Sequence, residues 1–179
     1  VLFRSDWLQG GHAYAGAVIG ALLAFYIWSL LSKQEANPNL SQLLMILPIL
    51  HFTGWLACFF DGCGYGATTF IGWASAELPD NFGLMAVRYQ TQLFGMLSAI
   101  LIGIPAWWWG RNNPQRSSSS FWFVLAILAL SRLTIYEWQG NIVPLFWGYR
   151  SDQLLTLAII IVAIFMSQLA KVEKGSRIR

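Results

Sequence analysis

Charged residues are scarce in this chain of 179 residues. Asp, Glu, Lys and Arg together make up 11% of the sequence, whereas hydrophobic residues make up 56%. A soluble domain carries about 25% charged residues, so this shortage argues against a soluble globular protein and favours an integral membrane protein. The net charge is only +3, and the basic residues form no cluster on a soluble face, which argues against a nucleic-acid-binding protein.

Histidine and cysteine are also rare, with two of each. Cys58 and Cys63 have four residues between them, a spacing that matches neither a zinc motif nor a redox motif, so no metal site is expected. A disulfide between them is the alternative to our expectation that they are small packing residues. His51 lies within an apolar run and is either a hydrogen-bonded structural residue or the ligand of a haem or chlorin.

Apolar residues are abundant and gather in five long runs. Each run approaches the length that an α-helix needs to cross a bilayer, and several of the ten Trp fall where the bilayer would meet water. We therefore predict an all-α, polytopic integral membrane protein, with residues 1–179 forming a single transmembrane helical domain. The predicted helices cover residues 11–31, 43–60, 91–109, 121–136 and 153–170, and the stretches "SKQEANPNLSQ" and "GRNNPQRSSSS" are predicted loops.

Basic residues divide unevenly between the two sides of the predicted bundle. Seven Lys and Arg lie on the side that holds these two loops and the C-terminal tail, and four lie on the opposite side. Segments rich in Lys and Arg remain in the cytoplasm. We therefore expect an external N-terminus and a cytoplasmic C-terminus.

Glycines mark two further features of the sequence. In "FFDGCGYGATT", Gly62, Gly64 and Gly66 alternate at the end of a predicted helix, which predicts a tight turn with at least one glycine at positive φ. In the helix at 11–31, Gly16 and Gly20 lie one turn apart. Small residues at this spacing allow another helix to approach closely, so we expect that helix to be central.

Six segments resemble, in order, the prolipoprotein diacylglyceryl transferases. They are "GGHAYAGAVIG", "PILHFTGWLACFFDGCGYG", "IGWASAELPD", "RYQTQLFGM", "SRLTIYEWQGN" and "SDQLLTLAIII". The resemblance implies a protein of a bacterial-type inner (cytoplasmic) membrane, with a fold of seven transmembrane helices, an external N-terminus and a cytoplasmic C-terminus. The five predicted helices would correspond to the last five of the seven, so we expect N-terminal helices upstream of Val1.

The resemblance also implies an outward-facing pocket in which a phospholipid head group meets a lipoprotein cysteine. The glycine scaffold of the matching turn is retained at Gly54, Gly62 and Gly66. Polar positions of the family pattern are replaced: the Arg position is Trp55, and the His position in the first segment is Ala15. The two Asn positions are Cys58 and Asp61, and the Glu position is Cys63.

Three polar residues of the family pattern are retained and are the candidates for binding a lipid head group: Arg88, Gln92 and Arg132. The family pattern places a Glu four residues after the last Arg, whereas here Glu137 follows Arg132 by five. Each Arg can hold a phosphate through its forked donors. The alternative is that the two pair with nearby acidic residues, namely Glu77, Asp80 or Glu137.

The replaced positions bear on catalysis. Transfer of a diacylglyceryl group from phosphatidylglycerol to a thiol requires cations for the phosphate leaving group and a base for the sulfur. We therefore expect a non-catalytic, lipid-binding scaffold or accessory subunit of a larger membrane complex. Its partners would be membrane lipids, including a bound phospholipid, and other membrane protein subunits. The alternatives are an active transferase with His51 as its base, and a pigment- or haem-binding subunit with His51 as the ligand.

Overall fold

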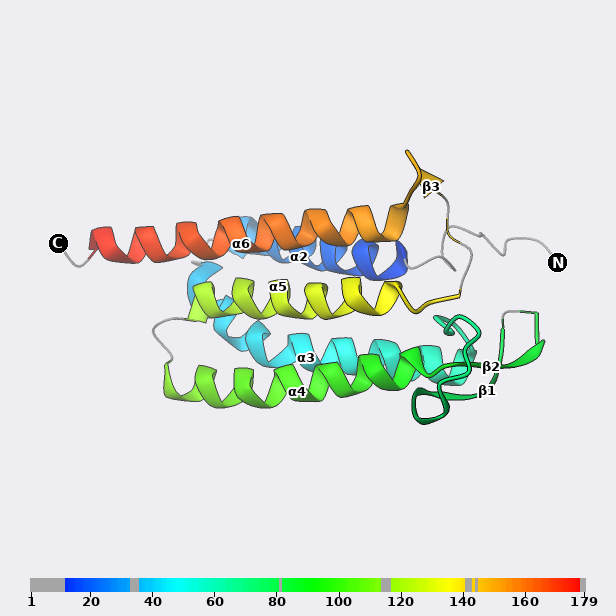
Figure 1. Ribbon diagram of the computed structural model, residues 1–179. Helices are drawn as coiled ribbons and strands as arrows, with labels where there is room; N and C mark the ends of the chain where they lie inside the picture. The colour runs from blue at the N-terminus through cyan, green and yellow to red at the C-terminus, as the bar shows by residue number, and fades with distance from the viewer. Residues whose placement is uncertain are drawn as a thin grey trace.

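The computed structural model describes residues 12–32, 36–80, 82–113, 117–140, 143 and 145–177. Long helices run side by side in an elongated bundle (Figure 1). These are α2 (His12–Ser32), α3 (Ala36–Asp61), α4 (Thr91–Asn112), α5 (Ser117–Tyr136) and α6 (Ser151–Arg177). Short elements join them at one end: the 3-10 helix η1 (Gly72–Ala74) and strands β1 (Ser75–Pro79), β2 (Met85–Tyr89), β3 (Leu145–Phe146) and β4 (Tyr149–Arg150).

The long helices have the composition of a membrane protein. Three segments are long and apolar enough to cross a bilayer: Thr91–Asn112, Ser118–Tyr136 and Ser151–Lys171. The apolar parts of α2 and α3 are shorter, at Tyr14–Trp28 and Ile46–Asp61. The described part of the chain is therefore mostly helical, and three of its helices qualify as membrane spans by length and composition.

Several helices extend further than the apolar runs predicted. α3 begins at Ala36 and α5 at Ser117, inside segments that we expected to be loops, and α6 continues to Arg177. The physical reason is that hydropathy marks only the part of a helix that prefers lipid. Backbone hydrogen bonding continues into polar flanks, and serine is well tolerated at the start of a helix.

Two antiparallel hairpins, absent from the all-α prediction, lie at one end of the bundle, which we call the hairpin end (Figure 1). In the β1–β2 hairpin Ser75 pairs with Tyr89, and in the β3–β4 hairpin Leu145 pairs with Arg150. An isolated bridge between Gly66 and Gln139 ties the loop after α3 to the segment after α5. These strands have two to five residues and are much shorter than the apolar runs from which the helices were predicted, so that criterion did not detect them.

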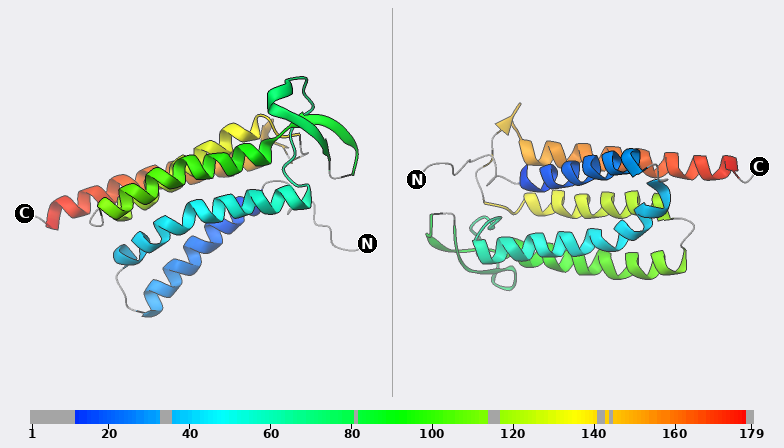
Figure 2. Two further views of the ribbon diagram at one scale, coloured as in Figure 1. Left: turned by 90° about the horizontal axis from the view of Figure 1, so that it is seen from below. Right: turned by 180° about the vertical axis from the view of Figure 1, so that it is seen from behind.

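The core centres on α5, which packs against α3, α4 and α6 (Figure 2). In α5, Leu128 and Ala129 are almost fully buried, and Ala163 of α6 is fully buried. The expectation that the helix at 11–31 is central is therefore wrong for the described residues. Gly16 and Gly20 of α2 face outward, and no described atom lies within 4 Å of where their Cβ atoms would be.

Close helix approach occurs instead between α3 and α4. A Cβ built on Gly103 would lie 2.8 Å from Cβ of Pro48, and one built on Gly110 would lie 2.9 Å from a methyl group of Leu44. A Cβ on Gly95 would overlap the indole ring of Trp55. The small-residue face that brings two helices together thus belongs to α4, because its glycines meet bulky side chains of α3.

Candidate functional site

The turn after α3 is closed by a disulfide between Cys58 and Cys63, which corrects our expectation that both are packing residues. Gly62 and Gly64 have φ angles of 73° and 63°, in the left-handed region that glycine adopts readily. The reversal at Gly62 brings Cys63 back over the last turn of α3, so that the two Cα atoms lie 4.6 Å apart. That separation is within the range a disulfide can bridge.

The start of α4 holds this turn in place. The hydroxyl of Thr91 donates to the carbonyl of Gly64, and Nε2 of Gln92 donates to the carbonyl of Cys63 at 3.0 Å. Both side chains are buried. Gln92, expected as a head-group contact, therefore uses its amide to hold the backbone of the turn.

Arg88 of β2 is engaged by neighbouring side chains. Its guanidinium lies 3.1 Å from the carboxylate of Asp80 and 4.9 Å from the ring centre of Tyr65. The expected alternative, pairing with Asp80, is thus present. Desolvation raises the pKa of Asp80, but the backbone N–H groups of Leu84 and Phe82 and the Arg88 guanidinium outweigh it, so this pKa lies below its usual value.

Arg132 of α5 lies among three aromatic rings, which together we call the aromatic cage: Tyr14, Trp55 and Tyr136. Its guanidinium carbon is 4.4 Å, 4.7 Å and 5.4 Å from their respective ring centres. These distances are typical of cation–π contacts. In the part of the chain that the structure describes, no carboxylate pairs with Arg132. Glu137, the expected alternative partner, accepts a hydrogen bond from Gln153 at 2.8 Å.

Tyr136 occupies the position four residues after Arg132. Residues with this spacing are neighbours on one helix face, and Nε of Arg132 donates to the Tyr136 hydroxyl at 2.8 Å. A neutral hydroxyl therefore stands where the family pattern described above has a carboxylate. Tyr136 also meets α6, where its hydroxyl is 3.5 Å from Oγ1 of Thr156. Nearby, the buried Asp152 pairs with Arg150 at 2.9 Å.

Trp55 joins the aromatic cage to His51. Its indole N–H donates to Nε2 of His51 at 3.1 Å, and the His51 ring meets Tyr14 edge-on, with ring centres 5.8 Å apart. Since Nε2 accepts this bond, the ring proton of the neutral imidazole resides on Nδ1. Nδ1 is buried and has no hydrogen-bond partner among the described residues.

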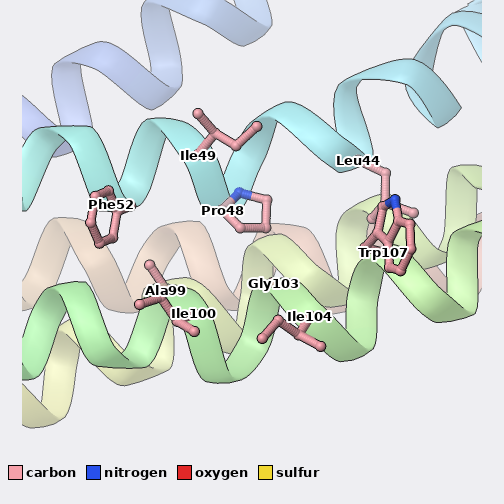
Figure 3. Close-up of a pocket in the computed structure, with 9 residues that line it drawn as sticks. All are labelled: Leu44, Pro48, Ile49, Phe52, Ala99, Ile100, Gly103, Ile104 and Trp107. Atoms are coloured by element: carbon pink, nitrogen blue, oxygen red, sulfur yellow. The ribbon is translucent and has the colours of Figure 1, made fainter.

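A groove of about 440 Å³ lies between α3 and α4, and none of the aromatic-cage residues lines it (Figure 3). Its walls are apolar, and several lining residues, such as Ile49 and Ile104, also face outward. With no titratable side chain, the groove can hold an apolar chain but offers no acid–base chemistry. It is lined by Leu44, Pro48, Ile49, Phe52, Ala99, Ile100, Gly103, Ile104 and Trp107.

The structure gives the sequence-predicted head-group candidates different partners. Arg132 lies in the aromatic cage, whereas Arg88 and Gln92 hold the β1–β2 hairpin and the turn. Sequence reasoning missed Tyr14 and Tyr136 as partners of Arg132. The spacing of Arg132 and Tyr136 within one helix was a usable signal, but the approach of Tyr14 depends on how α2 packs.

Comparison with known proteins gives consistent matches. The family model described as "Prolipoprotein diacylglyceryl transferase" matches residues 5–169. A phosphatidylglycerol--prolipoprotein diacylglyceryl transferase of Nitratidesulfovibrio vulgaris (strain DSM 19637 / Miyazaki F) is 27% identical over 119 residues, which cover 65% of this chain and 44% of that protein. No solved structure matches the chain.

A second relative aligns over more of the chain. Phosphatidylglycerol--prolipoprotein diacylglyceryl transferase 2 of Clostridium perfringens (strain 13 / Type A) is 21% identical over 174 residues. The alignment covers 97% of this chain and 67% of the relative. The chain therefore spans between 44% and 67% of the lengths of these two relatives.

Proposed function

Because the chain belongs to the prolipoprotein diacylglyceryl transferase family, we propose that it binds the head group of an anionic phospholipid at the aromatic cage without transferring its diacylglyceryl group. The observation that carries this proposal is the state of Arg132. Its guanidinium contacts three aromatic rings and has no carboxylate partner among the described residues. The two relatives carry phosphatidylglycerol in their names, and this is the lipid we propose here.

The charge balance of the aromatic cage supports an anionic ligand. A guanidinium inside a membrane protein is costly unless an opposite charge or hydrogen-bond acceptors surround it. The Tyr136 hydroxyl accepts a hydrogen bond from Nε of Arg132. Among the described residues, no acceptor bonds the two terminal amino groups of the guanidinium. A lipid phosphate provides both the negative charge and the oxygen atoms that this fork binds well.

The same residues argue against transfer. In the transferase reaction a C–S bond forms as a C–O bond of the lipid breaks, the thiol loses its proton, and the glycerol phosphate leaves with the bonding electrons. Loss of a single electrostatic stabiliser slows such reactions about 100- to 1000-fold. Here the matching Arg and Glu positions hold Trp55 and the disulfide-bonded Cys63. The candidate base, His51, already accepts a hydrogen bond from the indole N–H of Trp55.

We further propose that the hairpin end faces outward from a bacterial-type inner membrane, and that all five long helices cross it. Two independent features support this orientation. Disulfides form in oxidising, extracytoplasmic compartments, and Cys58 and Cys63 lie at the hairpin end. The excess of Lys and Arg lies toward the opposite side. The N-terminus would then be external and the C-terminus cytoplasmic.

The proposed role is that of a lipid-binding scaffold or accessory subunit. The outward face of α2, with Gly16 and Gly20, is free of described contacts and is available to a helix of another membrane protein. Purification from native membranes in a mild detergent should then recover the protein together with other subunits. Recovery of the protein alone would contradict the subunit part of the proposal.

The lipid-binding proposal is tested by native mass spectrometry of the purified protein with added phosphatidylglycerol. Arg132→Gln should weaken binding about 10- to 100-fold, the value of one hydrogen bond to a charged group. Arg111→Gln is the matched control, because Arg111 stacks on Trp107 in the last turn of α4, at the other end of the bundle. Equal binding by the two variants would overturn the proposal.

An active transferase is the second candidate, favoured by family membership and by the names of the two relatives. Incubation with phosphatidylglycerol and a cysteine-containing lipoprotein signal peptide separates the two functions. A thioether-linked diacylglyceryl product would establish transfer.

A pigment- or haem-binding role requires His51 to give up the Trp55 hydrogen bond, and an absorption spectrum of the purified protein tests it.

A further inference from the structure

We propose that the β3–β4 hairpin, Leu145–Arg150, is a membrane anchor whose aromatic tip inserts into the interfacial layer of the bilayer at the hairpin end. This inference does not depend on lipid binding at the aromatic cage. It is based on side-chain exposure, on the backbone conformation of the tip, and on the position of the hairpin relative to α6.

The first observation is the chemistry of the exposed side chains. Trp147 is 88% exposed, and Leu145, Phe146 and Tyr149 are each more than half exposed. The rings of Phe146 and Trp147 stack, with centres 5.1 Å apart and planes 25° apart, so they form one flat apolar surface. Contiguous apolar surface of this kind in contact with water is unfavourable and marks an interaction site.

The second observation concerns the backbone of the turn. Trp147 and Gly148 have φ angles of 52° and 82°, so both central residues of this two-residue hairpin are in the left-handed region. Such turns favour Asn, Asp or Gly at the first position. Trp147 is the one non-glycine residue at positive φ in the described chain. The backbone conformation of the turn therefore does not explain why a Trp occupies position 147, whereas contact of its side chain with a partner does.

The third observation identifies that partner as lipid. β4 ends at Arg150 and α6 begins at Ser151, so no linker separates the hairpin from the membrane-spanning segment Ser151–Lys171. The hairpin projects sideways from the end of α6 rather than along the bundle axis (Figures 1 and 2). A span that crosses the bilayer thus holds the hairpin in the interfacial plane, where Trp and Tyr are the preferred residues.

Depth measurements on the full chain in vesicles test the proposal. Tyr149→Cys is labelled with the environment-sensitive fluorophore NBD without reductant, so that the native disulfide is preserved. The vesicles contain phosphatidylcholine and phosphatidylglycerol, with nitroxide-bearing lipids that quench at the head-group level or deep in the chains. Control labels occupy Glu77→Cys, exposed on β1, and Ile161→Cys, exposed on α6.

The label at position 149 should emit at shorter wavelength than the label at 77, and the shallow nitroxide should quench it at least twofold more than the deep one. The label at 161 should show the reverse preference. Emission equal to that at 77 would overturn the proposal. A blue shift without lipid quenching would indicate that a protein covers the hairpin, which would also overturn it.

Second-site variants in the Tyr149→Cys background test the role of the indole. Trp147→Asn suits the positive φ of the turn, so the hairpin should remain folded while shallow quenching falls at least twofold. Trp147→Tyr keeps an interfacial aromatic ring and should retain most of the quenching. Unchanged quenching in Trp147→Asn would show that the tip does not anchor the hairpin.

Discussion

The indole N–H of Trp55 donates a 3.1 Å hydrogen bond to Nε2 of His51, one helical turn earlier in α3. Both residues are buried. This bond orients the Trp55 ring so that its face lies 4.7 Å from the Arg132 guanidinium. Sequence reasoning offered His51 as a hydrogen-bonded structural residue, a base or a haem ligand, and in this structure it is a hydrogen-bond acceptor that positions an aromatic ring.

Replacement of His51 should destabilise the protein. His51→Phe keeps a ring of similar shape but leaves the buried N–H of Trp55 without an acceptor, which costs about 1–3 kcal/mol. Thermal unfolding in detergent, followed by circular dichroism, measures the effect. Thr53→Val is the control, because the exposed Thr53 hydroxyl bonds, among the described residues, only to carbonyls of its own helix. Equal thermal unfolding midpoints for the two variants would contradict the expected contribution of this hydrogen bond to stability.

Two glycine substitutions should have opposite effects. A Cβ at Gly95 would overlap the Trp55 ring, so Gly95→Ala should destabilise the protein by about 1–3 kcal/mol. At Gly20 no described atom lies near the new Cβ, and alanine favours a helix by about 0.5–1 kcal/mol. The same thermal unfolding measurement compares them. Loss of stability in Gly20→Ala would show that another helix packs on α2.

The disulfide should be accessible only from outside the cell. In intact cells, a membrane-impermeant maleimide should label Cys58 and Cys63 only after treatment with a membrane-impermeant reductant. Replacing both with Ser should cost about 2 kcal/mol, because the closed loop is short. Labelling that requires cell lysis would place the hairpin end in the cytoplasm and contradict the proposed orientation.

Acid should loosen the β1–β2 hairpin. The pKa of Asp80 is lowered in the folded protein, so ionised Asp80 stabilises the folded state above its unfolded pKa near 4. This contribution is lost as the pH falls through the lower folded value. Amide hydrogen exchange in Met85–Tyr89, corrected for the intrinsic pH dependence of exchange, should show reduced protection at pH values below about 4. Asp80→Asn should abolish this pH dependence, and its persistence would implicate another group.

Several features followed from the sequence alone because they depend on local properties. Long apolar runs predicted the helices and the membrane environment. A single apolar segment can do so because, as a helix, it forms all its backbone hydrogen bonds within itself and can therefore lie in lipid. The glycines at 62 and 64 predicted a turn with positive φ, because side-chain sterics set that preference residue by residue. The ordered motifs also indicated the family, which the match over residues 5–169 confirms.

Other features depended on tertiary structure. In a membrane protein, lipid and core are equally apolar, so hydropathy does not tell which face of a helix is buried. For this reason the sequence did not show that α5 is central or that the glycines of α4 pack against α3. The aromatic cage brings together residues 14, 55, 132 and 136, which lie on three different helices.

The same reason applies to the charges and the cysteines. The sequence determined that Arg88 and Arg132 are present, but only packing decided that the first meets Asp80 and the second meets aromatic rings. The disulfide likewise required the chain reversal at Gly62, which brings the Cα atoms of Cys58 and Cys63 within 4.6 Å. Pairwise contacts depend on distance and orientation in space, and a local sequence pattern specifies neither.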